Sequence, residues 1–228
     1  MADAYFTAKT FRFLKDLAAN NSREWFNDNR HRYETEVREP SLRLIGDLAA
    51  PLAKISTHYL ADTRKQGGSL FRIHRDTRFA NDKMPYKTWS GARFAHERAK
   101  QVPAPSFYLH IQPDRCFAGG GIWHPESPTL KKIRDFLVDN PAAWTRGVHA
   151  KSFRDRFEFW GESLIRPPRG FDADHPLIDD LKRKNFAAGE NFANDIALSD
   201  ELLPHIVATF NGVAPLNDYL CAALDLEF

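Results

Sequence analysis

The residues best suited to chemistry lie in one short stretch, FRIHRDTRFANDKMPYKTW, at positions 71–89. It holds five cations and only two acids, namely Arg72, Arg75, Arg78, Lys83 and Lys87 against Asp76 and Asp82. Arginine presents a planar fork of donors that suits carboxylate and phosphate oxygens, and it stays charged when partly buried. Because two acids cannot neutralise five cations, this composition predicts a site for an anionic ligand.

The charge of the whole chain is unevenly distributed around this stretch. Residues 64–100 hold ten Lys or Arg and three acids, a net charge of +7, which leaves −5 for the rest of a chain with net charge +2. One basic segment on a mildly acidic body is typical of a localised anion site. We therefore favour an anionic small molecule as the partner. The alternative is a non-enzymatic module that binds nucleic acid or an acidic protein, because cations alternate here with the rings of Phe71, Phe79, Tyr86 and Trp89.

The predicted ligand-binding residues extend beyond this stretch. Pro85 stiffens the segment between two lysines, and the neighbouring tyrosine offers a hydroxyl group. In NNSREWFNDNR, two more arginines lie near the start of a predicted helix. The full predicted set is Arg23, Arg30, Arg72, Arg75, Arg78, Lys83, Tyr86 and Lys87. Asp76 is the candidate proton-transfer group, but an adjacent arginine would keep its pKa low and make it a weak base.

The same cations also fit a purely structural interpretation. Ion pairs with distant acids, such as Glu24, Glu34 or Glu36, would turn the cluster into a network that needs no ligand. The sequence leaves the ligand site and the network open as alternatives.

A metal site has weaker support. His74-x-Asp76 matches two ligands of a 2-His-1-carboxylate triad, with His110 or His124 as a distant third. His74 lies among arginines, however, which disfavour a cation. The run Gly119–Gly121 lacks the residues of a phosphate-binding or dinucleotide-binding loop, so it indicates a strand bulge, a close backbone approach or the floor of a ligand site. We predict neither a metal nor a cofactor.

Composition limits the class of protein. Hydrophobic residues make up 43% and charged residues 27% of the 228-residue chain, as in ordinary globular proteins. No run of eighteen apolar residues predicts a membrane span, and the charged start MADAYFTAKTFRFLKDL does not resemble a signal peptide. Cys116 and Cys221 are too few for a disulfide framework. These features predict a cytoplasmic protein without a membrane partner.

The elements that must position the cations begin with helices. Apolar spacing predicts three helices in the first 56 residues. Ser22 is a suitable cap for the second, in which Phe26, Tyr33 and Val37 share one face. Pro40 opens the third helix.

The middle of the chain predicts strands. Residues 69–75 alternate as a strand would, which puts Arg72 and Ile73 on opposite faces, although the spacing of the arginines also fits a helix. Residues 106–112 and 116–123 flank a turn and predict an antiparallel hairpin.

Helical patterns return in the last part of the chain. They begin at Ser127, at Pro141, near His175 with Asp174 as cap, after the cap Ser199, and near Pro215. Helices, then strands, then helices predict an α+β fold, with N-terminal helices, central antiparallel strands and C-terminal helices in a single domain over residues 1–228.

Three longer motifs carry a resemblance to a known family. NNSREWFNDNRHRYETEVREP, SLFRIHRDTRFANDKMPYKTW and GGGIWHPESPTLKKIR occur in this order. With them the chain closely resembles a family of uncharacterised bacterial and fungal proteins catalogued as domain of unknown function 2461. The resemblance spans roughly residues 8–220 and implies one domain, but no activity. The family commonly has Tyr where this chain has His74, which further weakens the metal interpretation.

Overall fold

A six-stranded antiparallel sheet lies at the centre of the computed structural model, which describes residues 4–78 and 81–228. The strand order is β1-β2-β3-β4-β6-β5. The strands are β1 (Tyr59–Leu60), β2 (Ser90–His96), β3 (Ser106–Ile111), β4 (Cys116–Ile122), β5 (Glu158–Phe159) and β6 (Phe186–Phe192). The predicted hairpin is confirmed as β3 and β4, which pair through Ser106 and Gly121 at one end.

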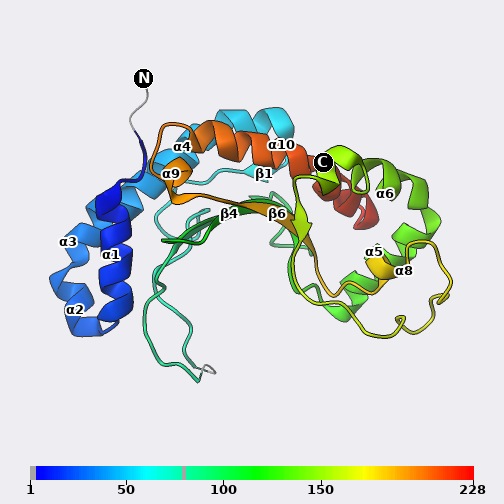
Figure 1. The fold of residues 1–228 in the computed structure, drawn as a ribbon, viewed down its shortest axis with the longest axis horizontal. Coiled ribbons are helices and arrows are strands. Elements are labelled where there is room, and N and C mark those ends of the chain that lie inside the picture. Colours follow the sequence, from blue (N-terminus) through cyan, green and yellow to red (C-terminus); the bar gives the residue numbers. More distant parts are fainter. Residues whose placement is uncertain (1–3, 79–80) are drawn as a thin grey trace.

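Helices precede, interrupt and follow the strands. They are α1 (Ala8–Ala19), α2 (Arg23–Asp28), α3 (Arg30–Tyr33), the π-helical segment η1 (Glu34–Arg38), α4 (Glu39–Ile55), α5 (Ser127–Asp139), α6 (Pro141–Gly147), α7 (Lys151–Arg154), α8 (Ile178–Leu181), α9 (Asn194–Ala197) and α10 (Leu202–Ala223). Figure 1 shows α4 and α10 on one side of the sheet, α1 to α3 at one end, and α5, α6 and α8 at the other. The predicted α+β fold with terminal helices around central antiparallel strands is confirmed.

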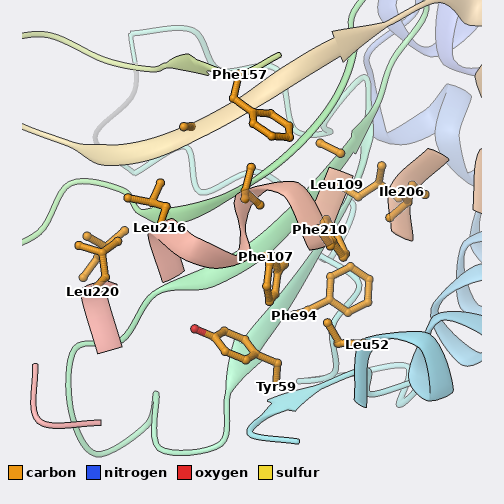
Figure 2. Close-up of a cluster of buried hydrophobic side chains, with 14 of the residues drawn as sticks. Leu52, Tyr59, Phe94, Phe107, Leu109, Phe157, Ile206, Phe210, Leu216 and Leu220 are labelled. Atoms are coloured by element: carbon orange, nitrogen blue, oxygen red, sulfur yellow. The ribbon is translucent and has the colours of Figure 1, made fainter. Parts of the chain in front are cut away.

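The main hydrophobic core fills the space between the sheet and α10. Phe94 of β2 and Phe107 of β3 are opposite one another in the register. Both rings contact Phe210 of α10, at centroid distances of 5.4 and 4.8 Å (Figure 2). A Cβ on Gly120 would approach Val213 of α10 to 3.1 Å, so this glycine allows the helix to pack closely on β4.

A second, smaller core joins the N-terminal helices to the segment that the sequence analysis singled out. Its buried members are Phe13, Leu14, Leu17, Phe26, Tyr33, Val37, Ile73 and Tyr86. The first six come from α1, α2, α3 and η1, whereas the last two come from the segment 71–89. We call residues 71–89 the basic arm. Burial of its two apolar side chains attaches the arm to the N-terminal helices.

The strand predicted at residues 69–75 is wrong. The described residues of the basic arm, 71–78 and 81–89, are irregular and extend away from the sheet (Figure 1), and isolated bridges pair Leu70 with Ala92 and His74 with Tyr86. The two branches of the arm exchange single backbone hydrogen bonds, among them one of 2.8 Å from Arg75 N to Pro85 O. Proline has no N–H with which to return such a bond, so it interrupts the ladder. Phe79 lies outside the described residues.

Two helix boundaries also differ from the sequence prediction. The second helix does begin after Ser22, whose hydroxyl accepts a hydrogen bond of 3.2 Å from Trp25 N. It then breaks at Asn29 and passes through η1 into α4 without an end at Pro40. The last helix is one element that continues through Pro215, because packing on β4 offsets an interior-proline cost of about 3 kcal/mol.

The remaining errors concern short or small-residue segments. Asp174 does not cap a helix, since α8 begins only at Ile178. The strand β6 has the sequence FAAGENF, in which alanine and glycine give little strand propensity. Its formation depends on pairing with β4 on one side and β5 on the other.

Candidate anion-binding site

A hydrogen-bonded clamp positions the basic arm against the start of α2. The side-chain amide of Asn21 donates to Tyr86 O and accepts from Tyr86 N, both at 3.0 Å. Asn21 immediately precedes Ser22, the cap of α2, so the clamp fixes Arg23 opposite the arm. Asn21 is not among the residues predicted from the sequence to belong to the site.

Stacked rings form the base of the site. Phe26 of α2 stacks on Tyr86 with a centroid distance of 4.1 Å and an interplanar angle of 21°. The ring of His74 lies 5.3 Å from Tyr86 and 6.4 Å from Phe26. Phe26 and Tyr86 are buried, whereas His74 is exposed at the edge of the stack. The aromatic base therefore holds the imidazole at the surface.

A pocket of about 320 Å³ lies between α2 and the arm. Its lining residues are Arg23, Asn27, His74, Arg75, Thr77, Pro85 and Tyr86. Three of the predicted ligand-binding residues, Arg23, Arg75 and Tyr86, are among them. None of the lining residues is acidic, so the described walls present positive charge and neutral donors. We call this the arm pocket.

Four cations converge on His74. Burial lowers the pKa of His74, and the positive charges of Arg72, Arg30, Lys87 and Arg23 lower it further. These cations come from α2, α3 and both branches of the arm. The positive charge of four side chains is therefore concentrated around His74.

Most of these four cations lack anionic partners. Within the described chain, Arg23 and Arg72 make no side-chain hydrogen bond or ion pair, and Arg30 donates only to the amide oxygen of Asn27 at 3.2 Å. Lys87 Nζ donates to two carbonyl oxygens, of Arg72 at 2.5 Å and of His74 at 3.0 Å. Carbonyl groups satisfy the hydrogen bonds of an ammonium group but do not neutralise its charge.

The cations nearer the tip of the arm have local partners. Arg75 pairs with Asp82 at 2.6 Å, and Arg78 pairs with Asp76 at 2.6 Å. Lys83 Nζ donates to the carbonyl oxygen of Thr77 at 3.0 Å. The predicted cluster of five cations is therefore divided, because its two acids pair with Arg75 and Arg78 and not with Arg72, Lys83 or Lys87.

The acids proposed for a structural network lie in other pairs. Glu34 binds Arg38 at 2.5 Å, and Glu36 binds Arg32 at 3.6 Å. Glu24 makes no ion pair among the described residues. The described chain thus contains no carboxylate from these three positions that pairs with the basic arm.

Asp76 lies apart from the arm pocket. A hydrogen bond from Arg78 lowers the pKa of Asp76 to about 2, so its carboxylate is ionised at neutral pH. This lowering of the pKa of Asp76 agrees with the sequence prediction. A role for Asp76 in proton transfer stays a prediction, and its pKa favours charge pairing over acid catalysis.

The other sequence candidates have structural partners. His110 is buried. Its Nδ1 lies at hydrogen-bond distance, 3.1 Å, from the Tyr108 hydroxyl oxygen, and its Nε2 lies 3.0 Å from Gln112 Oε1. Among the described residues, no three His, Cys, Asp or Glu side chains gather as metal ligands would. A Cβ on Gly119 would meet the Trp160 ring at 2.7 Å, so Trp160 occupies the space above this glycine.

Comparison with known proteins gives one match. The family described as conserved hypothetical protein DUF2461 matches residues 9–219. The chain belongs to the DUF2461 family. No curated protein and no solved structure matches it. The DUF2461 description states no activity, so the interpretation of the arm pocket depends on its own residues. In the part of this DUF2461 chain that the structure describes, no helix has the length and apolar character needed to cross a bilayer.

Proposed function

We propose that this DUF2461 protein binds a small ligand carrying a phosphate or carboxylate group in the arm pocket. The observation that carries the proposal is the convergence of four cations on His74, of which Arg23 and Arg72 make no side-chain hydrogen bond or ion pair within the described chain. Like charges gathered without counter-charges repel one another, and an anion bound among them relieves that repulsion.

The residues would divide the work according to their geometry. The guanidinium groups of Arg23 and Arg72 supply donors that suit two oxygens of one anionic group. Arg30 and Lys87 do not line the pocket, but their positive charges also act on His74. Asn27 and Thr77, both in the lining, offer neutral hydrogen bonds that orient the rest of the ligand.

His74 gives the proposed site a proton-linked response. Positive neighbours lower its pKa while no anion is bound. An anion placed among those neighbours favours the imidazolium form and raises the pKa of His74. Ligand binding would therefore be accompanied by proton uptake at slightly acidic pH.

Single-stranded nucleic acid is the second candidate ligand. Phe71 is 37% exposed, and Lys87 Nζ lies 5.9 Å from the centroid of its ring, which is the pairing of ring and cation that stacks a base beside a phosphate. Tyr86 is buried and Trp89 is half-buried, so the described aromatic residues of the arm do not form an open stripe. This burial favours the small anion.

Anion-dependent unfolding tests the first proposal. Phosphate or sulfate at about 100 times its dissociation constant should stabilise the native state by about 2.7 kcal/mol relative to chloride of equal ionic strength. The double variant Arg23→Gln/Arg72→Gln should lose most of this gain, whereas the exposed Arg166→Gln should keep it. Equal stabilisation of all three proteins, or of none, would contradict the proposal.

Salt dependence separates the two ligands. Binding of an oligonucleotide should weaken with salt at a slope of about −0.7 for each phosphate contacted, if nucleic acid is the ligand. If no oligonucleotide binds at low salt while phosphate binds saturably, nucleic acid is excluded as the ligand and the small anion is supported.

The cellular compartment is part of the same proposal. Cys116 and Cys221 are both buried free thiols, which supports a reducing cytoplasm. Cell fractionation tests it, and recovery from the medium or an oxidising compartment would contradict it.

A further inference from the structure

A second pocket lies beside the edge strand β5. Figure 1 shows α6 and α8, which flank or contribute to it, at the opposite end of the molecule from α2, which contributes to the arm pocket. The second pocket has a volume of about 380 Å³, within the range of small-molecule sites. It is built from two segments, residues 148–159 and residues 176–183, which follow α6 and contain α8. We call it the His149 pocket.

A buried carboxylate organises the polar side of this pocket. The side chain of Asp180 is 6% exposed and lies between His149 Nε2, at 2.8 Å, and Arg183 Nε, at 3.0 Å. Burial of an unpaired carboxylate would be costly, so the two donors are needed to keep the charge inside. The pair holds the imidazole and the guanidinium group in fixed positions on the pocket wall.

This arrangement leaves hydrogen-bonding capacity directed away from Asp180. A carboxylate does not donate, so Nε2 of His149, 2.8 Å from Asp180, is the nitrogen that carries hydrogen, and in a neutral imidazole the lone pair is then on Nδ1. Among the described residues, nothing binds Nδ1 of His149 or the terminal nitrogens of Arg183. The guanidinium carbon of Arg183 lies 3.8 Å from the centroid of the Phe159 ring, which fixes its plane.

The charge of the pocket differs from that of the arm pocket. Asp180 offsets Arg183, and Asp179 pairs with Lys182 at 3.4 Å. The side chain of Arg154, an exposed lining residue, makes no ion pair or hydrogen bond within the described chain. One uncompensated cation suits a single negative charge better than a multiply charged phosphate.

The rest of the lining is apolar. It consists of Val148, Phe153, Phe157, Phe159, Pro176 and Leu177. No Ser, Thr, Cys or Lys is among the lining residues. Apolar walls with a few fixed polar groups are typical of sites that take a ring-sized organic ligand.

We propose that the His149 pocket binds a small organic carboxylate that has an apolar, ring-sized body and a hydroxyl group. The ring lies against the phenylalanine walls, and the carboxylate accepts hydrogen bonds from Arg154 and Arg183. The hydroxyl group donates to Nδ1 of His149, which Asp180 holds in position. This site is independent of the anion site proposed at the basic arm.

Calorimetric titration of the full chain tests the charge and the ring. Phenylacetate should bind at least about tenfold more tightly than its neutral isostere phenylacetamide, because hydrogen bonds to charged groups are the stronger ones. Arg154→Gln should remove most of that difference, and the matched Arg146→Gln, an exposed arginine of α6 outside the pocket, should retain it. Equal binding of acid and amide, or no binding of either, would overturn the proposal.

The hydroxyl contact and the location need separate measurements. Mandelate, which adds one hydroxyl group to phenylacetate, should bind more tightly than phenylacetate, and His149→Phe should abolish the advantage. No advantage for mandelate would remove the role of His149. Amide resonance shifts on titration should cluster in residues 148–159 and 176–183, and shifts confined to the basic arm would overturn the assignment of the site.

Discussion

Arginine and histidine side chains have different charge environments at the basic arm and in the His149 pocket. At the basic arm, the charges of Arg23 and Arg72 act on His74, and neither side chain makes an ion pair in the described chain. In the His149 pocket, Asp180 is buried, accepts a hydrogen bond from Arg183 and lies 2.8 Å from Nε2 of His149. The cations of the basic arm keep positive charge that a ligand can neutralise. In the His149 pocket, the paired charges instead hold side chains in fixed positions in the pocket lining.

An unpaired excess of surface charge and a buried ion pair contribute differently to the free energies of folding and of ligand binding. Exposed cations that repel one another cost little stability and gain on binding an anion. A buried ion pair is costly to break, because removing one partner leaves the other charge desolvated. We therefore expect substitutions in the His149 pocket to lower the free energy of unfolding more than substitutions at the basic arm. Substitutions at the basic arm should mainly weaken anion binding.

The largest expected effect is at Asp180. Asp180→Ala should lower the free energy of unfolding by about 3 kcal/mol, at the low end for a buried pair because Arg183 and His149 remain partly hydrated. Urea denaturation measures the loss. The exposed Asp179→Ala provides the matched control and should change stability by less than about 0.5 kcal/mol. Similar losses of unfolding free energy in the two variants would show that the buried Asp180 contributes no more to stability than an exposed carboxylate.

The Asn21 clamp should have the next largest effect. Asn21→Ala removes two hydrogen bonds to the Tyr86 backbone, and a loss of about 1–2 kcal/mol is expected. Hydrogen exchange should become faster at Tyr86 and Lys87 but not in β3 or β4. Because the clamp fixes Arg23 opposite the arm, phosphate-dependent stabilisation should weaken as well. Unchanged exchange in the arm would show that the ring stack alone holds it.

Arginine substitutions within the arm sharpen the comparison further. Without anions, Arg23→Gln should be neutral or slightly stabilising, because it removes repulsion and breaks no pair. Arg75→Gln should cost up to about 1 kcal/mol, since it breaks a partly exposed pair with Asp82. A loss of several kcal/mol at Arg23 would mean that this cation has a structural role.

The sequence predicted the location of the basic site better than its construction. The density of cations was visible in the chain, and so were the hairpin β3–β4 and the cap Ser22. The division of the cluster was not, because it depends on which carboxylates the folded arm brings to Arg75 and Arg78. Clamping by Asn21, 65 residues from Tyr86, has no local signal.

The His149 pocket could not be predicted for a related reason. His149 and Asp180 are distant in the chain, and neither lies in a motif with a recognisable spacing. They meet because β5 and α8 are both brought to the edge of the sheet by β6, a strand whose small residues gave no clear pattern. Pairings between distant segments, set by tertiary packing, decide both the strand and the pocket.

The smallest expected effect is the pH dependence contributed by His74. Burial and the four cations lower the pKa of His74 below its usual value of 6.5. Between the lowered native pKa and 6.5, the unfolded chain binds more protons than the native protein, so native stability increases as the pH rises through this window. Above 6.5 both states are neutral and the contribution is constant.

Urea denaturation of the native sequence and of His74→Gln between pH 5 and 8 isolates this contribution. His110 and His205, whose pKa values are also lowered by burial, titrate in both proteins and cancel in the difference. In chloride the difference in stability should rise with pH up to about 6.5 and then level off. In sulfate of equal ionic strength the rise should shrink, because a bound dianion offsets the cations that depress the pKa of His74. An identical difference curve in both salts would show that no anion binds close to His74, and the basic arm would then resemble the other end of the molecule, where charge serves the fold.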